Sequence, residues 1–110
     1  MHIVYNVTVK IENVVKDDWY QWMRTVHIPD VMKTGCFLES RLSRILGEDE
    51  TGGVTWSVQY IAPDMKTFNT YQQKYAPDLQ RQHTERYRGH YVAFRTLLEV
   101  HDTIRHLHLN

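Results

Sequence analysis

The sequence predicts a single α+β domain with the element order β-α-β-β-α-β. Three observations predict it: an alternation of apolar and polar residues near the N-terminus, two amphipathic stretches interrupted by proline, and a polar Gly-containing segment between two later alternating stretches. With 110 residues, of which 42% are apolar, the chain can form one core without disulfides. We expect one domain over residues 1–100, followed by a polar His-containing tail over residues 101–110.

The first element is a strand over residues 3–11, in which apolar and polar side chains alternate almost strictly. One side of this strand carries Ile3, Tyr5, Val7, Val9 and Ile11. The other side carries Asn6, Thr8 and Lys10. This pattern is typical of a strand that is buried on one face only.

The second element is an amphipathic helix over residues 16–26. Its apolar stripe consists of Trp19, Trp22, Met23 and Val26. Asp17 and Asp18 complement the positive end of the helix dipole. Pro29 disfavours the helical conformation of Ile28, so we expect the helix to end there. His27 then lies at the edge of the buried face, where it meets solvent.

A hairpin follows this helix. Residues 36–46 alternate, with an apolar set of Cys36, Leu38, Leu42 and Leu46, opposite Phe37, Glu39, Arg41 and Ser43. The segment GEDETGG at residues 47–53 has the composition of a polar loop. The two-residue alternation of a strand then resumes over residues 54–62. Its apolar face is formed by Val54, Trp56, Val58, Tyr60 and Ala62.

The last two elements are a second helix and a final strand. Asp64 is the expected N-cap, Pro77 interrupts the helix, and Gly89 closes it. Its apolar face carries Met65, Phe68, Tyr71 and Tyr75, then Leu79, His83 and Tyr87. The strand over residues 91–100 is expected to point Val92, Phe94, Leu98 and Val100 towards the core.

This order is that of the ferredoxin-like fold, in which two helices cover one face of a four-stranded antiparallel sheet. The other sheet face is expected to carry the ligand-binding candidates Asn6, Glu39, Arg41, Gln59 and Arg95. Arginine binds carboxylates and phosphates through paired donors and keeps its charge. A plain solvated sheet face is the alternative interpretation.

Several segments also resemble a small bacterial family known only as a domain of unknown function. The resemblance runs from about residue 2 to residue 100 and rests on YNVTV, WYQWMRTVHIPDVMKTGCF, VQYIAPD, YAPDLQRQHTERY and VAFRTLLE. More distantly, the pattern is similar to the dimeric α/β-barrel superfamily, which includes antibiotic-biosynthesis-monooxygenase-like enzymes that need no cofactor. That resemblance implies a homodimer in which two sheets face each other around a polar cavity. It carries over no catalytic residue.

Three classes of function remain open from the sequence. The first is binding of a small anionic or aromatic molecule in the polar cavity, as a non-catalytic or regulatory module. The second is a cofactor-free monooxygenase or isomerase, with His27 as general base and Arg41 or Arg95 stabilising an enolate. The third is a structural protein whose open sheet face docks another protein.

Individual aromatic and thiol side chains each have a structural and a functional interpretation. Four tyrosines could line a pocket for an aromatic ligand, although aromatic residues at helical spacing are more often core: Tyr60, Tyr71, Tyr75 and Tyr87. His83 is expected to be a core histidine with a satisfied hydrogen bond. Cys36 is expected to be a packed thiol.

Composition argues against other classes. Thirteen basic and thirteen acidic residues give no net charge, which disfavours nucleic-acid binding. A single cysteine and the lack of a long apolar run predict a soluble protein of the cytoplasm without membrane contact. The sequence contains no Gly-rich phosphate loop, Ser elbow or HExxH motif, so we expect no cofactor. The tail histidines His101, His106 and His108 are too weak a signal to predict a metal site.

Overall fold

A computed structural model of the chain describes residues 1–106; His108 of the predicted tail lies outside the described residues. The elements in chain order are β1 (Ile3–Ile11), α1 (Lys16–Trp22), η1 (Met23–His27), α2 (Ile28–Lys33), β2 (Glu39–Arg44), β3 (Val54–Ala62), α3 (Met65–Lys74), α4 (Ala76–Tyr87) and β4 (Tyr91–Glu99). The fold is the predicted α+β ferredoxin-like fold.

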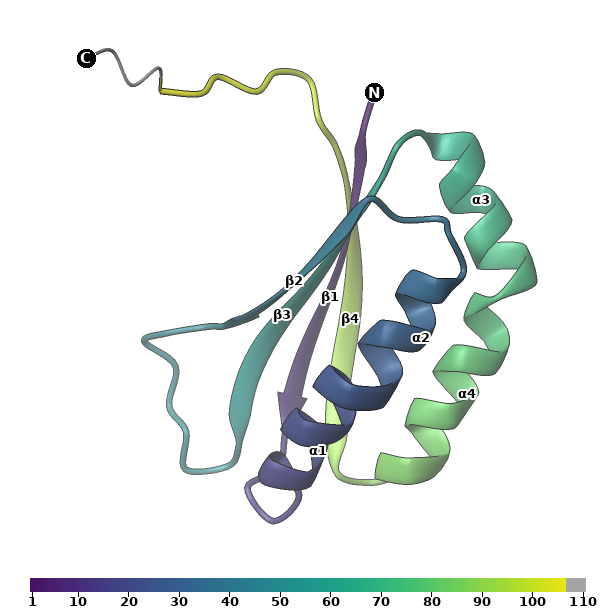
Figure 1. Cartoon of the computed structure of the whole chain (residues 1–110). Helices are drawn as coiled ribbons and strands as arrows, with labels where there is room; N and C mark the ends of the chain where they lie inside the picture. The colour runs from purple at the N-terminus through teal and green to yellow at the C-terminus, as the bar shows by residue number, and fades with distance from the viewer. Residues whose placement is uncertain (107–110) are drawn as a thin grey trace.

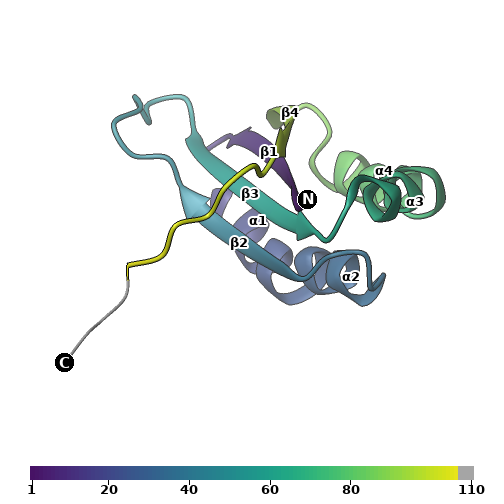
Figure 2. The same ribbon diagram turned by 90° about the horizontal axis from the view of Figure 1, so that it is seen from above.

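The four strands form one antiparallel sheet in the order β2-β3-β1-β4. All helices lie on one side of this sheet, and the other side is left open (Figures 1 and 2). The central pair β1 and β3 aligns Tyr5 with Tyr60 and Val7 with Val58. Directly opposed residues share a face of the sheet, so the inward sets predicted for these two strands are confirmed.

The first helical segment differs from its prediction. It does not end before Pro29 but continues to Lys33 through η1, a π-helical turn in which the N–H of Ile28 donates to the carbonyl of Met23. Pro29 is accommodated because it occupies the first turn of α2, where a missing N–H costs little. The wider turn also shifts the helical phase: Trp19 and Met23 are buried, whereas Val26 faces solvent.

The second helical segment follows its prediction closely. The N–H of Thr67 donates to the Asp64 side chain at 2.7 Å, which caps α3. Tyr75 separates α3 from α4, and Pro77 lies in the first turn of α4. Gly89 has φ of 80°, a left-handed conformation that glycine adopts without steric cost, and it ends the segment as expected.

Strand β2 is shorter than predicted, and the residues that precede it do not alternate between the two faces of the sheet. Leu42 faces the helices as expected, since it is paired with Val58. Cys36 and Phe37 are both buried, however, because they precede the strand and are not bound by its alternation. The predicted inward residues Leu38 and Leu46 are instead exposed.

The predicted orientation of β4 was wrong. Arg95 is paired with Val7 and Ala93 with Val9, so these residues face the helices. Val92 and Phe94 lie on the open face and are 68% and 63% exposed. Two backbone bonds at the start of the strand set this register: the N–H of His90 donates to Tyr87, and the N–H of Glu12 donates to His90.

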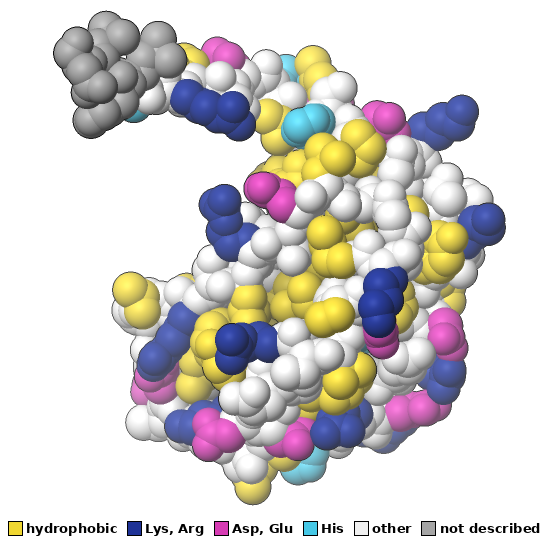
Figure 3. All heavy atoms as spheres, viewed as in Figure 1, with side chains coloured by type: hydrophobic (Ala, Val, Ile, Leu, Met, Phe, Trp, Pro, Cys, Tyr) yellow, Lys and Arg dark blue, Asp and Glu magenta, His cyan; other side chains and the backbone are white. Residues whose placement is uncertain are grey.

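The core lies between the helices and the sheet. Its most completely buried large side chains are Trp19, Tyr87, Phe68, Ile11, Val31 and Val58. On the surface seen in Figure 3, basic and acidic side chains are interspersed. This distribution agrees with the zero net charge and gives no broad basic surface on that side.

Candidate functional site

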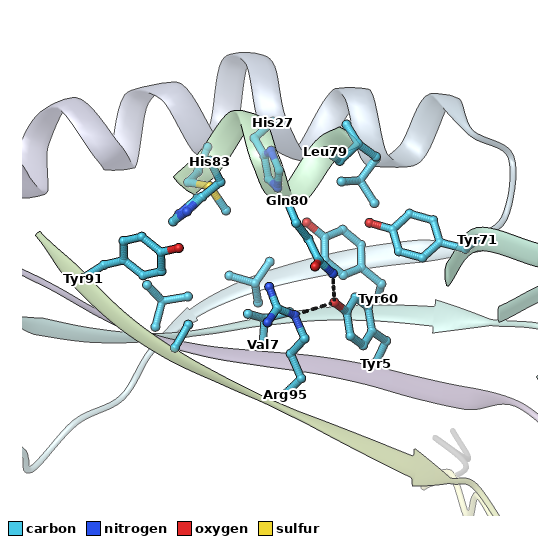
Figure 4. Close-up of a pocket in the computed structure, with 15 residues that line it drawn as sticks. Tyr5, Val7, His27, Tyr60, Tyr71, Leu79, Gln80, His83, Tyr91 and Arg95 are labelled. Carbon is cyan, nitrogen blue, oxygen red and sulfur yellow. Dashed lines mark hydrogen bonds between the residues drawn. The ribbon is translucent and has the colours of Figure 1, made fainter. Parts of the chain in front are cut away.

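A cavity lies between the helical layer and the sheet (Figure 4). The space inside it that is open to the centres of water-sized molecules is about 50 Å³. Four elements of the helical layer contribute to it, η1, α2, α3 and α4, and strands β1, β3 and β4 form the sheet side. The lining residues are Tyr5, Val7, Val9, Met23, His27, Val31, Val58, Tyr60, Tyr71, Leu79, Gln80, His83, Tyr91, Ala93 and Arg95.

His27 reaches the cavity from the π-helical turn η1. Its ring stacks on Trp22, with 5.0 Å between ring centroids and 24° between planes. Nδ1 of His27 is buried and has no hydrogen-bond partner among residues 1–106. Burial lowers the pKa of His27 to about 4, against the opposing effect of the Asp30 charge. The imidazole is therefore neutral at physiological pH.

His83 lies beside His27, with 5.8 Å between ring centroids. Nε1 of Trp19 donates to Nε2 of His83 at 2.9 Å, so the neutral ring carries its proton on Nδ1. Burial, together with the smaller effects of the charges of His27 and Arg95, lowers the pKa of His83 to about 4. The prediction that His83 is a core histidine with a satisfied hydrogen bond is confirmed for its Nε2 atom. His83 also lines the cavity.

Arg95 lies at the exposed end of the cavity and reaches inward from β4. Its Nε donates to the hydroxyl of Tyr5 at 2.9 Å, and Nε2 of Gln80 is 3.5 Å from the same oxygen. Within residues 1–106, Arg95 forms no ion pair, and no aspartate or glutamate lines the cavity. The guanidinium is thus held in place but not neutralised.

The other predicted ligand-binding residues lie on the opposite sheet face. Arg41 is aligned with Gln59, and Gln59 with Asn6, so these three side chains share the open face. Arg41 also forms an exposed ion pair with Glu39 at 3.8 Å. The expected convergence of Arg95 with Arg41 and Gln59 was wrong, because the register of β4 turns Arg95 to the helical side.

The tyrosines divide into two groups. Tyr60 and Tyr71 line the cavity, together with Tyr5, which its strand pattern had placed only on the apolar side of β1. Tyr87 instead donates to Asp18 at 2.7 Å and joins α4 to α1. Tyr5 and Gln80 could have been found from the sequence only with the register of β4 in hand, because their polar ends meet at Arg95.

The C-terminal tail contributes no metal centre among the residues that the structure describes. His101 bonds Glu99 at 2.7 Å. No group of three or more His, Cys, Asp or Glu side chains in residues 1–106 is arranged to hold a metal ion. Within the same range, no helix is long and apolar enough to cross a membrane.

The family model described as a domain of unknown function, DUF4286, matches residues 2–101. The chain is a member of the DUF4286 family. This confirms the resemblance drawn from its sequence segments. Among proteins of curated function, none matches the sequence.

Solved structures similar to this DUF4286 protein share its fold at low sequence identity. A cofactor-independent oxygenase from Streptomyces nogalater, SnoaB, is 11% identical, with a TM-score of 0.69 over 96% of this chain and 98% of that one. HapK from Hahella chejuensis is 10% identical, with a TM-score of 0.69 and coverage of 97% and 99%. A protein from Deinococcus radiodurans assigned to the antibiotic biosynthesis monooxygenases is 10% identical, with a TM-score of 0.68 and coverage of 96% and 98%. The fold expected from the distant resemblance is therefore confirmed.

Proposed function

We propose that this protein binds a small polar molecule with a flat ring in the cavity between the helices and the sheet. The observation that carries the proposal is the unpartnered Nδ1 of His27, buried in a cavity that also holds the unneutralised Arg95. Buried polar atoms are nearly always hydrogen-bonded, and one without a partner is expected to gain it from an occupant. An aromatic cavity with a few convergent polar groups is the usual form of a ligand site.

A fragment screen by thermal denaturation, followed by NMR of the hits, tests this proposal. Hits should raise the melting temperature of the native protein, and Arg95→Gln should reduce that rise. Arg41→Gln is the matched comparison, since it removes a guanidinium from the open face. The open-face residues Asn6, Glu39, Arg41 and Gln59 are the alternative ligand site, and a larger loss in Arg41→Gln would favour it.

Catalysis at the same cavity is the second candidate function. The observation that favours it is that His27 and Arg95, the proposed base and the proposed enolate-stabilising group, line one cavity. The fold shared with a cofactor-independent oxygenase supports it as analogy. Turnover of an enolisable or aromatic compound without added cofactor would distinguish an enzyme from a binding module. His27→Ala should abolish turnover and weaken binding only by the loss of one hydrogen bond.

We further propose that two copies pair through their open sheet faces. The support is the apolar side chains that β4 leaves uncovered there: Val92, Phe94 and Leu98. The exposed Glu39 and Arg41 on the same face could pair with their counterparts in a second copy. A cytoplasmic setting belongs to this proposal, since Cys36 is a free, buried thiol.

A further inference from the structure

One end of the cavity is formed by three tyrosines from three different elements. Tyr5 comes from β1, Tyr60 from β3 and Tyr71 from α3. The ring of Tyr5 is 6.0 Å from that of Tyr60 and 6.0 Å from that of Tyr71. Figure 4 shows their hydroxyl ends turned towards the same part of the cavity, beside Gln80 and Arg95.

These hydroxyls are available as hydrogen-bond donors. The oxygen of Tyr5 accepts from Arg95 at 2.9 Å and lies 3.5 Å from Nε2 of Gln80, which leaves its O–H free to donate. The hydrogen bonds at this end of the cavity, within residues 1–106, involve the hydroxyl of Tyr5 and not those of Tyr60 and Tyr71, and both of these residues line the cavity. Burial raises the pKa of each, so both phenols keep their protons.

Hydrogen-bond donors therefore predominate at this end of the cavity. Three O–H groups and one guanidinium can donate, and no carboxylate of the described lining competes for them. A neutral carbonyl offers two lone pairs to such a set, whereas a carboxylate offers about four on two oxygens and a charge that complements Arg95. The donor number and the charge both favour the carboxylate.

The remainder of the cavity suits a flat apolar group. Its sheet side is formed by Val7, Val9, Val58 and Ala93. Opposite them lie the neutral rings of His27 and His83. A ring or an unsaturated chain attached to the carboxylate would pack between these surfaces.

We propose that the occupant is a small aromatic or unsaturated carboxylic acid, whose carboxylate is bound by Arg95 and the hydroxyls of Tyr5, Tyr60 and Tyr71. This inference rests on the proposed ligand site and adds the chemical class of the ligand. It also assigns Tyr5, Tyr60 and Tyr71 as binding residues.

Two acid–ester pairs test it: benzoate with methyl benzoate, and cinnamate with methyl cinnamate. Each compound is titrated into protein carrying ¹³C in its tyrosine rings, and the NMR signals are followed. We expect each acid to shift the signals of Tyr5, Tyr60 and Tyr71, and to bind at least about tenfold more tightly than its ester, because hydrogen bonds to a charged group are stronger.

Variants that remove one hydroxyl complete the test. Tyr60→Phe and Tyr71→Phe should each weaken acid binding by about tenfold and ester binding by a smaller factor, because a neutral carbonyl accepts weaker hydrogen bonds than a carboxylate. Tyr75→Phe is the matched control, because Tyr75 is half-buried on the neighbouring turn and does not line the cavity. The same spectra report whether each variant is folded.

The outcomes separate this inference from the proposed site. Esters that shift the cavity tyrosines as strongly as the acids, or hydroxyl variants that bind the acids normally, would overturn the carboxylate assignment and leave the ligand site standing. If neither acids nor esters shift any cavity signal, both proposals fail.

Discussion

His27 and His83 make the stability of the protein depend on pH. Both have a pKa of about 4 in the folded chain against an ordinary value of 6.5, because burial disfavours their charged forms. Between these values the unfolded chain binds more protons than the folded one, so stability falls as pH drops. Each shift corresponds to about 3 kcal/mol, and the two are not additive because the rings are in contact.

The first prediction follows from this difference. The free energy of unfolding, measured with urea, should be constant above about pH 7 and decrease between pH 6.5 and pH 4. His27→Asn and His83→Asn should each flatten this decrease. His2→Asn, at an exposed position, is the control and should leave the slope unchanged. A wild-type protein that is equally stable at pH 7 and pH 5 would contradict the burial of the pair.

A second prediction concerns the hydroxyl of Tyr87. It donates to Asp18 at 2.7 Å, accepts from Nε of Arg86 at 3.1 Å, and has its pKa raised to about 12 by burial and the Asp18 bond. Tyr87→Phe keeps the buried ring and leaves Asp18 with only Arg86. It should lower the free energy of unfolding by about 1–2 kcal/mol. Tyr75→Phe is the control, and an equal loss there would contradict a specific role of the bond.

At the scale of elements, the π-helical turn η1 determines where His27 points. The N–H of Ile28 bonds the carbonyl of Met23 across this turn, and Pro29 follows in the first turn of α2. Pro29→Ala should therefore change the free energy of unfolding by less than about 1 kcal/mol, since no bond is lost at its nitrogen and the first turn of a helix does not require that N–H. The measurement is again urea unfolding.

Ile28→Pro provides the contrast within the same turn. It removes the bond to Met23 and should cost about 3 kcal/mol or more. Similar effects of the two substitutions would show that the helix is interrupted at Pro29, as the sequence pattern had indicated.

The strands and helices were predictable where a single local sequence pattern determined them. The alternation of β1 and β3 was strict, and the Asp64 cap and the Gly89 stop are determined by neighbouring residues. Proline rules gave the wrong end for the first helix, because Pro29 lies in the first turn of α2, where a missing N–H costs little. Only the bonds around that turn in the folded chain reveal this.

The orientation of β4 was not predictable from its own residues. Its sequence, YVAFRTLLE, carries apolar residues on both faces, so alternation does not choose between them. The choice is made by the bonds of His90 to Tyr87 and Glu12. Because of this register, Arg95 lies in the cavity with His27 and not on the open face, as had been predicted. No other difference between prediction and structure changed the candidate site as much.

At the scale of the whole molecule, the uncovered apolar residues of β4 bear on the oligomeric state. If two copies pair through the open sheet face, light scattering on a sizing column should give a mass near twice 13.2 kDa. Phe94→Lys should shift that mass to the monomer, because it places a charge at the centre of the exposed apolar row.

Two results would contradict this pairing. One is a mass near 13.2 kDa for the native protein at all concentrations, which would favour a face that docks another protein. The other is a dimer that Phe94→Lys does not disturb. Lys74→Ala, at an exposed position on α3, is the control for non-specific effects of charge.

The central claim is that ligands occupy the cavity beside His27 and leave the open sheet face unchanged. The most direct measurement is ¹⁵N NMR of the histidine side chains, together with backbone amide spectra, during titration with hits from the fragment screen. The account predicts that ligand binding moves the Nδ1 signal of His27 and the amides around Arg95. Shifts that gather instead at Asn6, Arg41 and Gln59 would contradict it and place the ligand on the opposite face of the sheet.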